Sequence, residues 1–322
     1  MSELLAPALP TLPTRARMRR TAPAVVSAVA MIIMIAVCAS LQPDVLTVAG
    51  LSLVLSATVP LVIAAQAQMT LMSVGDIDLG IGNFVGLVTV VSATTLVSSP
   101  ATGALILLAL VAAYAVLGAL IHLRRVPSLI ATLGASFVWL GLGLFALPTP
   151  GGTTPEWLAS FGTWQPAGFP APLLPILVVA AVVYLLTARS TLGVRMRGLG
   201  SNPVALERAG LRPLASRVMA YATAGALGVL SGLVLASQTG GGDVSSASSY
   251  SLMTVAAVIL GGGSFHGGSA VPWGVAVGGV TLGLVSVVLS LLDVPTNMQS
   301  AVQGVIVLAV LAGRVVVGKV LR

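Results

Sequence analysis

Two carboxylates, Asp76 and Asp78, lie in a glycine-rich segment at residues 75–83, with long apolar stretches on both sides. A carboxylate at the centre of a membrane-spanning helix costs about 2.5–3.5 kcal/mol, so it persists beside water, inside protein or at a helix N-terminus. Glycine permits unwound backbone, which membranes tolerate where it lines a cavity. One reading therefore places both carboxylates at a translocation path or its gate. The other has them cap the following helix, where free N–H groups and the helix dipole favour Asp.

A second glycine-rich segment, residues 261–269, contains the run Gly-Gly-Gly-Ser-Phe-His-Gly-Gly-Ser. It lacks the Lys-Ser/Thr ending of a phosphate-binding loop, and G-x-x-x-x-G-K-[ST] occurs nowhere in the chain, so we expect no ATP hydrolysis by this subunit. A lone histidine such as His266 is more often structural than titrating, and no set of residues has the spacing of metal ligands. The candidate residues of the path or gate in both segments are Gly75, Asp76, Asp78, Gly80, Gly82, Asn83, Gly262, Gly263, Ser264, Gly267 and Gly268.

The polar run at residues 188–217 holds six of the fifteen Lys and Arg residues. Within it, Asn202 suits a helix N-cap, Pro203 the first helical position and Gly210 the stop after the last turn. This pattern predicts a helix over residues 203–209, about two turns and roughly 10 Å long. A helix this short is not stable alone in water. We therefore expect a docking element here, held by something else, although basic residues in such a loop can also serve only to fix membrane topology.

The elements that position these segments are apolar helices. The chain is 57% hydrophobic and 7% charged, whereas soluble domains are typically about 25% charged, so a soluble globular domain is excluded. A bilayer core takes roughly 20 residues per helix, which predicts an all-α polytopic membrane protein with about ten transmembrane helices, some broken by glycine. The predicted spans are residues 23–41, 46–71, 79–98, 102–121, 128–147, 172–187, 214–237, 250–262, 269–291 and 296–314.

The positions of the basic residues predict the topology, because Lys and Arg favour cytoplasmic loops. With ten spans and a cytoplasmic N-terminus, every Lys and Arg cluster lies in the cytoplasm, and so does the C-terminus. Residues 1–22 are predicted to be a flexible cytoplasmic tail. Residues 23–322 are predicted to form a single transmembrane domain, with residues 188–213 as a cytoplasmic loop. The net charge of +7 does not indicate nucleic acid binding, because the basic residues sit between spans and form no face with interleaved aromatics.

These observations leave different classes of function open. An ion- or proton-coupled secondary transporter would use Asp76 and Asp78 as a relay. An intramembrane enzyme has little support, because the chain contains no Ser/His/Asp set and no H-E-x-x-H motif. The lone cysteine, Cys38, lies in an apolar run and excludes a disulfide.

Four stretches of the sequence resemble one transporter family. GDIDLGIG at residues 75–82 is similar to its G-G-I-D-L-S-V-G, and VPSLIATLG at 126–134 to its V-P-x-F-I-A-T-L-G. TLGVRMRGLGSNPVALERAGL at 191–211 resembles T-x-x-G-R-x-x-x-A-x-G-x-N-x-x-A-A-x-x-S-G-I, and VAAVILGGGSFHGG at 255–268 resembles A-A-V-V-L-G-G-T-S-L-S-G-G. The chain thus resembles the permease subunits of bacterial ABC importers for simple sugars, of the ribose, xylose, arabinose and autoinducer-2 type, in the branched-chain amino-acid/sugar permease superfamily.

The resemblance implies a permease in the bacterial inner membrane that is not itself an enzyme and carries no cofactor. It would pair with a second copy or a paralogue, receive a monosaccharide or similar small polar solute from a periplasmic or extracellular binding protein, and be driven by a cytoplasmic ABC ATPase. Residues 191–211 match the element that couples such a permease to its ATPase. The coupling residues implied are Gly200, Asn202, Pro203, Glu207, Arg208 and Gly210. Asp78 matches the family's aspartate, whereas Asp76 replaces a glycine.

Overall fold

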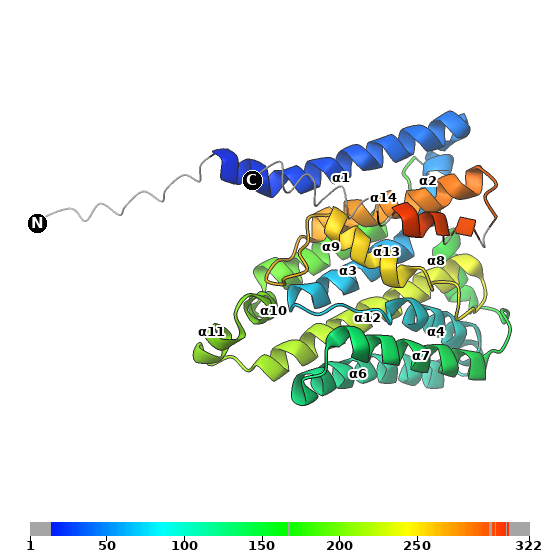
Figure 1. Ribbon diagram of the computed structural model, residues 1–322. Coiled ribbons are helices and arrows are strands. Elements are labelled where there is room, and N and C mark those ends of the chain that lie inside the picture. The colour runs from blue at the N-terminus through cyan, green and yellow to red at the C-terminus, as the bar shows by residue number, and fades with distance from the viewer. Residues whose placement is uncertain (1–13, 167, 296–297, 300, 307, 309–322) are drawn as a thin grey trace, which may run out of the picture.

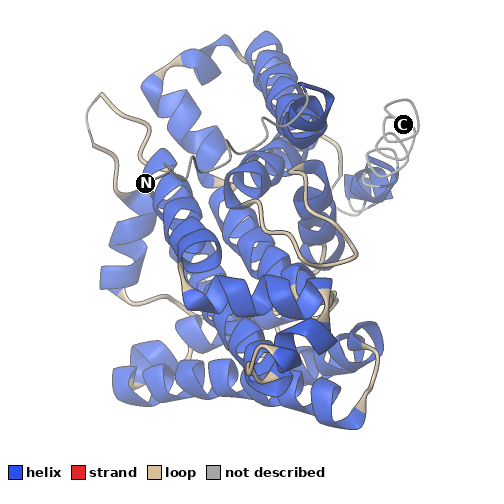
Figure 2. Cartoon of the chain, turned by 90° about the vertical axis from the view of Figure 1, so that its left-hand side faces the viewer, coloured by secondary structure: helices blue, strands red, loops and turns tan. Residues whose placement is uncertain are grey.

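The structure is a computed structural model that describes residues 14–166, 168–295, 298–299, 301–306 and 308. The described residues form helices and no strand, which confirms the all-α prediction (Figure 2). The helices are α1 (Thr14–Leu41), η1 (Pro43–Leu46), α2 (Val48–Ser56), α3 (Val59–Ser73), α4 (Ile81–Ala93), α5 (Thr95–Ser98), α6 (Pro100–Arg124), α7 (Ser128–Ala146), α8 (Glu156–Thr163), α9 (Leu173–Tyr184), η2 (Leu185–Arg189), α10 (Thr191–Ser201), α11 (Pro203–Arg208), α12 (Pro213–Thr239), α13 (Tyr250–Leu260) and α14 (Pro272–Leu291).

The number of candidate spans among the described residues is lower than the ten predicted. Five helical stretches are long and apolar enough to cross a bilayer, or up to seven if each bent pair counts as one span. The bent pairs are α2 with α3, at 45°, and α9–η2 with α10, at 70°. Residues 27–41 and α13 are apolar but shorter than a full span. The count falls because bends and short helices divide apolar stretches that read as continuous, and because the predicted span 296–314 lies mostly outside the described residues.

The predicted N-terminal tail is also only partly described. Residues 1–13 lie outside the described residues, and α1 begins at Thr14, earlier than the predicted span at residue 23. In Figure 1, α1 runs along one side of the molecule next to α14.

The centre of the fold is α3, in which every residue is buried. It contacts α12, α13 and α14 and lies between α1 on one side and α6 and α7 on the other (Figure 1). A helix that is apolar all round is buried on every side. Among its polar residues, Thr70 Oγ1 donates to the Gln66 carbonyl and Ser73 Oγ donates to the Thr70 carbonyl. The Gln66 side-chain amide nitrogen donates to the Pro272 carbonyl, whereas its amide oxygen is buried without a hydrogen-bond partner among the described residues.

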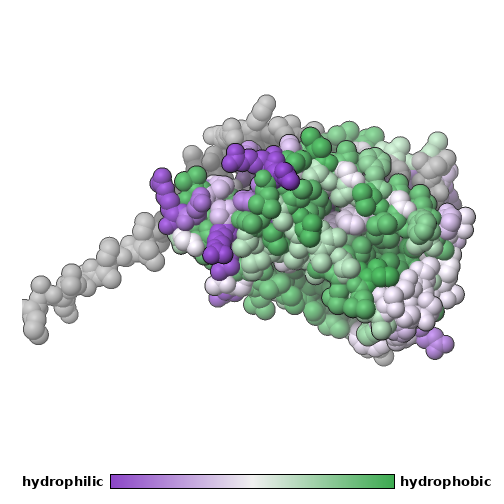
Figure 3. Space-filling view, turned by 90° about the horizontal axis from the view of Figure 1, so that it is seen from below, coloured by the Kyte–Doolittle hydropathy of each residue, from purple (hydrophilic) through white to green (hydrophobic). Residues whose placement is uncertain are grey.

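The outer surface of α6 and α7 is apolar and exposed, with side chains such as Leu108, Val116 and Phe137 more than half accessible. Figure 3 shows hydrophobic residues over most of one face, with the most strongly hydrophilic residues at the left-hand end and a paler hydrophilic patch at the right-hand end. An exposed apolar surface of this extent is stable against lipid and not against water. The surface thus agrees with a protein that spans a membrane.

The helices have two distinct ends. One end, here called the basic end, carries the connections 74–80, 125–127, 190–212 and 261–271. At the opposite end, Gly151 and Gly242 exchange two backbone hydrogen bonds of 3.0 and 2.8 Å. These bonds join the segment after α7 to the segment after α12, so two separate connections are tied together there.

Candidate functional site

Asp78 lies in the connection between α3 and α4, and its carboxylate is enclosed by protein. The residue is 1% exposed. Oδ1 accepts a 2.6 Å hydrogen bond from the Gly80 N–H, and Oδ2 accepts one of 2.8 Å from the Tyr114 hydroxyl of α6. Burial raises the pKa of Asp78 to about 6, against the opposing effect of these hydrogen bonds. Asp78 thus lies at the N-terminus of α4, where the helix dipole favours a carboxylate, although α4 has no side-chain N-cap hydrogen bond.

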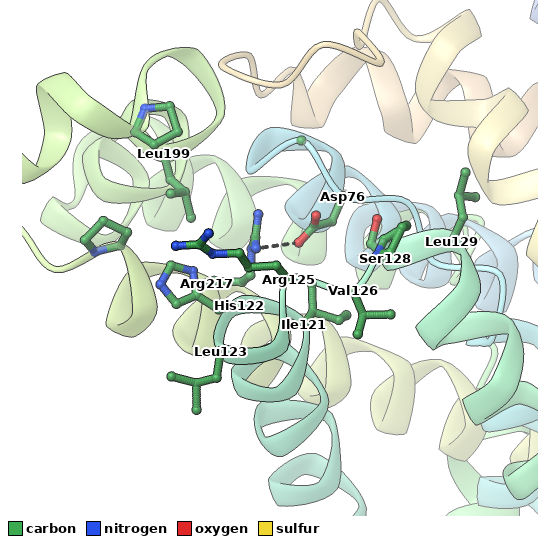
Figure 4. A pocket seen from close by; sticks show the side chains of 14 residues that line it. Asp76, Ile121, His122, Leu123, Arg125, Val126, Ser128, Leu129, Leu199 and Arg217 are labelled. Carbon is green, nitrogen blue, oxygen red and sulfur yellow. Dashed lines mark ion pairs between the residues drawn. The ribbon is translucent and has the colours of Figure 1, made fainter.

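Asp76, two residues earlier, faces a different neighbour. Its Oδ2 atom lies 3.1 Å from Nε of Arg217, in the first turns of α12. Figure 4 shows this ion pair at the wall of a cavity, with Ser128 on the other side of the carboxylate. The side chain of Asp76 is 7% exposed, so its charge is balanced by the guanidinium more than by solvent.

The cavity at the basic end has a volume of about 720 Å³. Its walls come from the connection after α3, the turn between α6 and α7, the end of α10 and the starts of α11 and α12 (Figure 4). The lining residues that carry charge or can carry it are Asp76, His122, Arg125 and Arg217. Cationic groups outnumber the single carboxylate, and that carboxylate is already paired.

Most residues predicted for the first part of the path pack helices together. A Cβ atom on Gly80 would lie 2.8 Å from the Thr132 carbonyl oxygen of α7. The Asn83 amide donates to Ser136 Oγ, also on α7, at 2.9 Å. Gly82 is pressed in the same way against the carbonyl oxygen of Ala247. Of the candidates at 75–83, Gly75 and Asp76 line the cavity and the others do not. Their place on a translocation path remains a prediction.

The second glycine segment is fastened to α3. The Gly268 N–H donates a 2.9 Å hydrogen bond to the Ser73 carbonyl, and the Gln66 amide donates one of 2.8 Å to the Pro272 carbonyl. Gly262, Gly267 and Gly268 have φ angles of 100°, 76° and 74°, which L side chains rarely adopt. Ser264 Oγ accepts from the His266 N–H, so this serine stabilises the turn itself. Gly263 lies against Val258 of α13.

The short helix predicted in the basic loop is present as α11, and its caps are confirmed. Asn202 Oδ1 accepts a 3.0 Å hydrogen bond from the Ala205 N–H, and Pro203 occupies the first turn. The helix ends at Arg208, one residue before the predicted end, and Gly210 follows with a φ of 78°. Leu206 is buried, whereas Glu207 and Arg208 are exposed on the outer face. A Cβ on Gly198 would lie 2.8 Å from Leu206, so α11 rests directly on α10.

The structure joins the two glycine segments to the basic loop at one place. A Cβ on Gly200 would overlap the Ser73 carbonyl oxygen and lie 3.1 Å from the Gly267 Cα. A Cβ on Gly267 would lie 3.0 Å from the Gly75 backbone nitrogen. We call Gly75, Gly200 and Gly267 the glycine junction. Gly200 was predicted as a coupling residue, whereas Gly75 and Gly267 were predicted for the path, and apart from their being glycines the sequence carries no sign that the three meet.

Tyr114 and Arg217, the partners of the two carboxylates, were not predicted from the sequence. Tyr114 lies within an apolar run, and Arg217 reads as one more basic residue of a cytoplasmic loop. The described residues contain no group of three or more His, Cys, Asp or Glu side chains that could hold a metal ion.

Residues 50–311 match the family model described as the permease component of branched-chain amino acid transport systems. The ribose import permease protein RbsC of Haemophilus influenzae is 26% identical over 295 residues, covering 89% of this chain and 91% of the relative. The RbsC protein of Escherichia coli K12 is 27% identical over 290 residues, covering 88% and 90%. The autoinducer 2 import system permease protein LsrC of Shigella flexneri is 31% identical over 281 residues, covering 83% and 79%. No solved structure matches the chain.

Proposed function

The chain belongs to the permease family of branched-chain amino acid transport systems and is a multi-pass inner-membrane protein, and we propose that it imports a monosaccharide or similar small polar solute. Relatives that match along most of the chain are named as permeases for ribose and for autoinducer 2. The Ile-Asp-Leu sequence at residues 77–79 supports the sugar branch of this family.

The ATP-driven mechanism is supported by the structure of α11. It is a capped helix that presents Glu207 and Arg208 outward while Leu206 anchors it to α10. A two-turn helix held in place in this way is suited to a cleft in another protein. In this proposal a separate cytoplasmic ATPase hydrolyses ATP, the basic end faces the cytoplasm, and the permease has no catalytic residue of its own.

The same proposal assigns the remaining partners. A binding protein delivers the solute at the end opposite the basic end, and a second permease copy or a paralogue completes the path in the membrane. The alternative of a proton-coupled transporter has less support from the geometry. Asp76 is paired with Arg217, and Asp78 is enclosed by Gly80 and Tyr114, so neither carboxylate is a free relay group.

Reconstitution of the permease with its ATPase and binding protein in proteoliposomes tests this function. The Glu207→Arg variant reverses a charge on the exposed face of α11, and we expect ATP hydrolysis without solute uptake. Uptake of a panel of radiolabelled monosaccharides and release of phosphate are measured in parallel. The matched control is Glu156→Arg, an exposed charge reversal on α8 at the opposite end. Wild-type uptake by Glu207→Arg contradicts the coupling role. Uptake driven by a proton gradient without ATP contradicts the ATP-driven mechanism.

A further inference from the structure

We propose that the Asp76–Arg217 ion pair is a positioning device that transmits movement of α11 to the backbone at the first glycine segment. The inference rests on the proposed function, because it assumes that a partner displaces α11. It concerns a feature of this chain in particular, since Asp76 stands where the pattern of similar permeases has glycine.

The first step is the covalent path from α11 to Arg217. Four residues, 209–212, separate α11 from α12, and Arg217 lies near the beginning of α12. Leu211 N–H donates to the Leu206 carbonyl, which holds this connection close to the end of α11. A displacement of α11 therefore moves the first turns of α12 and the guanidinium of Arg217.

The second step is the ion pair itself. Asp76 and Arg217 are the two members of the one salt bridge found among the described residues, and their charged atoms are 3.1 Å apart. Asp76 is buried, so its carboxylate gains less from water than from the guanidinium and is expected to follow it. Gly75, directly before Asp76, has a φ of 87° and no neighbour within 4 Å of a Cβ position. The Gly75 N–H is held by the Met72 carbonyl at 3.1 Å, but the open space on the Cβ side of Gly75 gives the backbone room to shift when the carboxylate is pulled.

The third step is the glycine junction, which connects α10 to the first glycine segment by a second route, separate from the ion pair. Gly200 meets Ser73 and Gly267 backbone to backbone, with no side chain between them to absorb a shift by rotating. Closely packed interiors transmit such displacements. The cavity lies between these two connections and is lined by residues of both, among them Gly75, Leu199 and Arg217. Its shape should accordingly change with the position of α11.

A cysteine reporter in the cavity tests the proposal. Cys38 is the only cysteine and is buried, so a Cys38→Ser background leaves one reactive site when Leu129→Cys is added. Leu129 lines the cavity and is 44% exposed. The permease–ATPase complex in inside-out vesicles is treated with a membrane-impermeant maleimide, with and without ATP and vanadate. We expect the labelling rate to change when the ATPase is locked by nucleotide and vanadate.

The ion pair is then removed in a double-mutant cycle. We expect Asp76→Asn and Arg217→Gln each to reduce the nucleotide-dependent change in labelling rate by about threefold or more. The reduction in the double variant should be no larger than that in the more strongly affected single variant. Asp76→Gly is a second test of the same position, because glycine is the residue of the family pattern. Glu156→Gln, at the opposite end, is the control and should respond like the parent.

The outcomes separate the two proposals. If the ATPase fails to associate with the parent permease, the proposed function is overturned and the inference with it. If the ATPase associates and all variants, including Asp76→Gly, show the parent's change in labelling rate, the inference alone is overturned. Reductions that simply add in the double variant also overturn it, because the two residues would then act independently. Co-purification of the ATPase with each variant shows that it has folded.

Discussion

The hydroxyl of Tyr114 donates a 2.8 Å hydrogen bond to Oδ2 of Asp78, which joins the middle of α6 to the connection between α3 and α4. Both residues are buried, and the rings of Phe84 and Trp139 surround that of Tyr114 at centroid distances of 4.3 and 6.1 Å. With Gly80 N–H on the other carboxylate oxygen, Asp78 is satisfied without water. Through these two hydrogen bonds, the Asp78 carboxylate joins α6 to the N-terminus of α4.

We expect Tyr114→Phe to lower the stability of the permease by about 1–3 kcal/mol, because a buried carboxylate oxygen loses its donor. The measurement is the apparent unfolding temperature of the purified protein in detergent. Tyr184→Phe is the matched control, since the Tyr184 hydroxyl makes no hydrogen bond to the described residues. Equal unfolding temperatures for both variants would show that the Tyr114 bond does not stabilise the fold.

We expect Asp78→Ala to impair solute uptake more than Asp76→Ala. Loss of Asp78 leaves the Tyr114 hydroxyl and the Gly80 N–H buried without a partner. Loss of Asp76 leaves Arg217 beside a cavity, where water can solvate the guanidinium. Uptake is compared per amount of inserted permease, and the reverse order would contradict the match of Asp78 to the family's aspartate.

We expect Gly200→Ala to destabilise the permease by about 1–3 kcal/mol or more, because the added methyl group overlaps the Ser73 carbonyl oxygen. Gly134→Ala in α7 is the control. It places the same group in open space, and within a helix this change is favourable by about 0.5–1 kcal/mol. Thermal unfolding of the two variants should shift in opposite directions. A tolerated alanine at position 200 would mean that the glycine junction is loose.

We expect Asn202→Ala to weaken ATPase binding and Asn202→Asp to preserve it. Alanine removes the side-chain acceptor of the Ala205 N–H, and loss of an N-cap costs about 0.5–2 kcal/mol. If α11 must be folded to bind, the dissociation constant of the permease–ATPase complex rises by about 2- to 30-fold. Titration of labelled ATPase against permease in nanodiscs measures it. Equal affinities for the two variants would exclude α11 as a docking element.

The parts of this protein that sequence could predict depend on local chemistry. The caps of α11 follow from the preferences of Asn202, Pro203 and Gly210, each of which acts within one turn of its own position. The membrane helices follow from long apolar runs, and α6, α7 and α12 lie close to their predicted bounds. The backbone bends by 45° between α2 and α3, where Pro60 lies in the first turn of α3. The hydropathy of residues 46–71 does not predict this bend, because no polar run marks the break.

The parts that could not be predicted depend on residues far apart in the chain. The pairing of Asp76 with Arg217 needs the connection after α3 to meet the start of α12, and neither residue carries a local sign of the other. The same holds for Gly200 and Gly267, whose role is the absence of a side chain. Tyr114 lies within a long apolar run, and nothing local in the sequence indicates that its hydroxyl bonds to Asp78.

The hydrogen bonds between Gly151 and Gly242 have a mechanical consequence for α12. They secure the backbone just beyond one end of this helix, while its other end begins four residues after α11. α12 also packs against α3, α4 and α6, so it moves together with its neighbours and not as a free rod. In the proposed mechanism, a displacement of α11 is therefore expected to shift the start of α12, where Arg217 lies, more than the end that these two bonds secure.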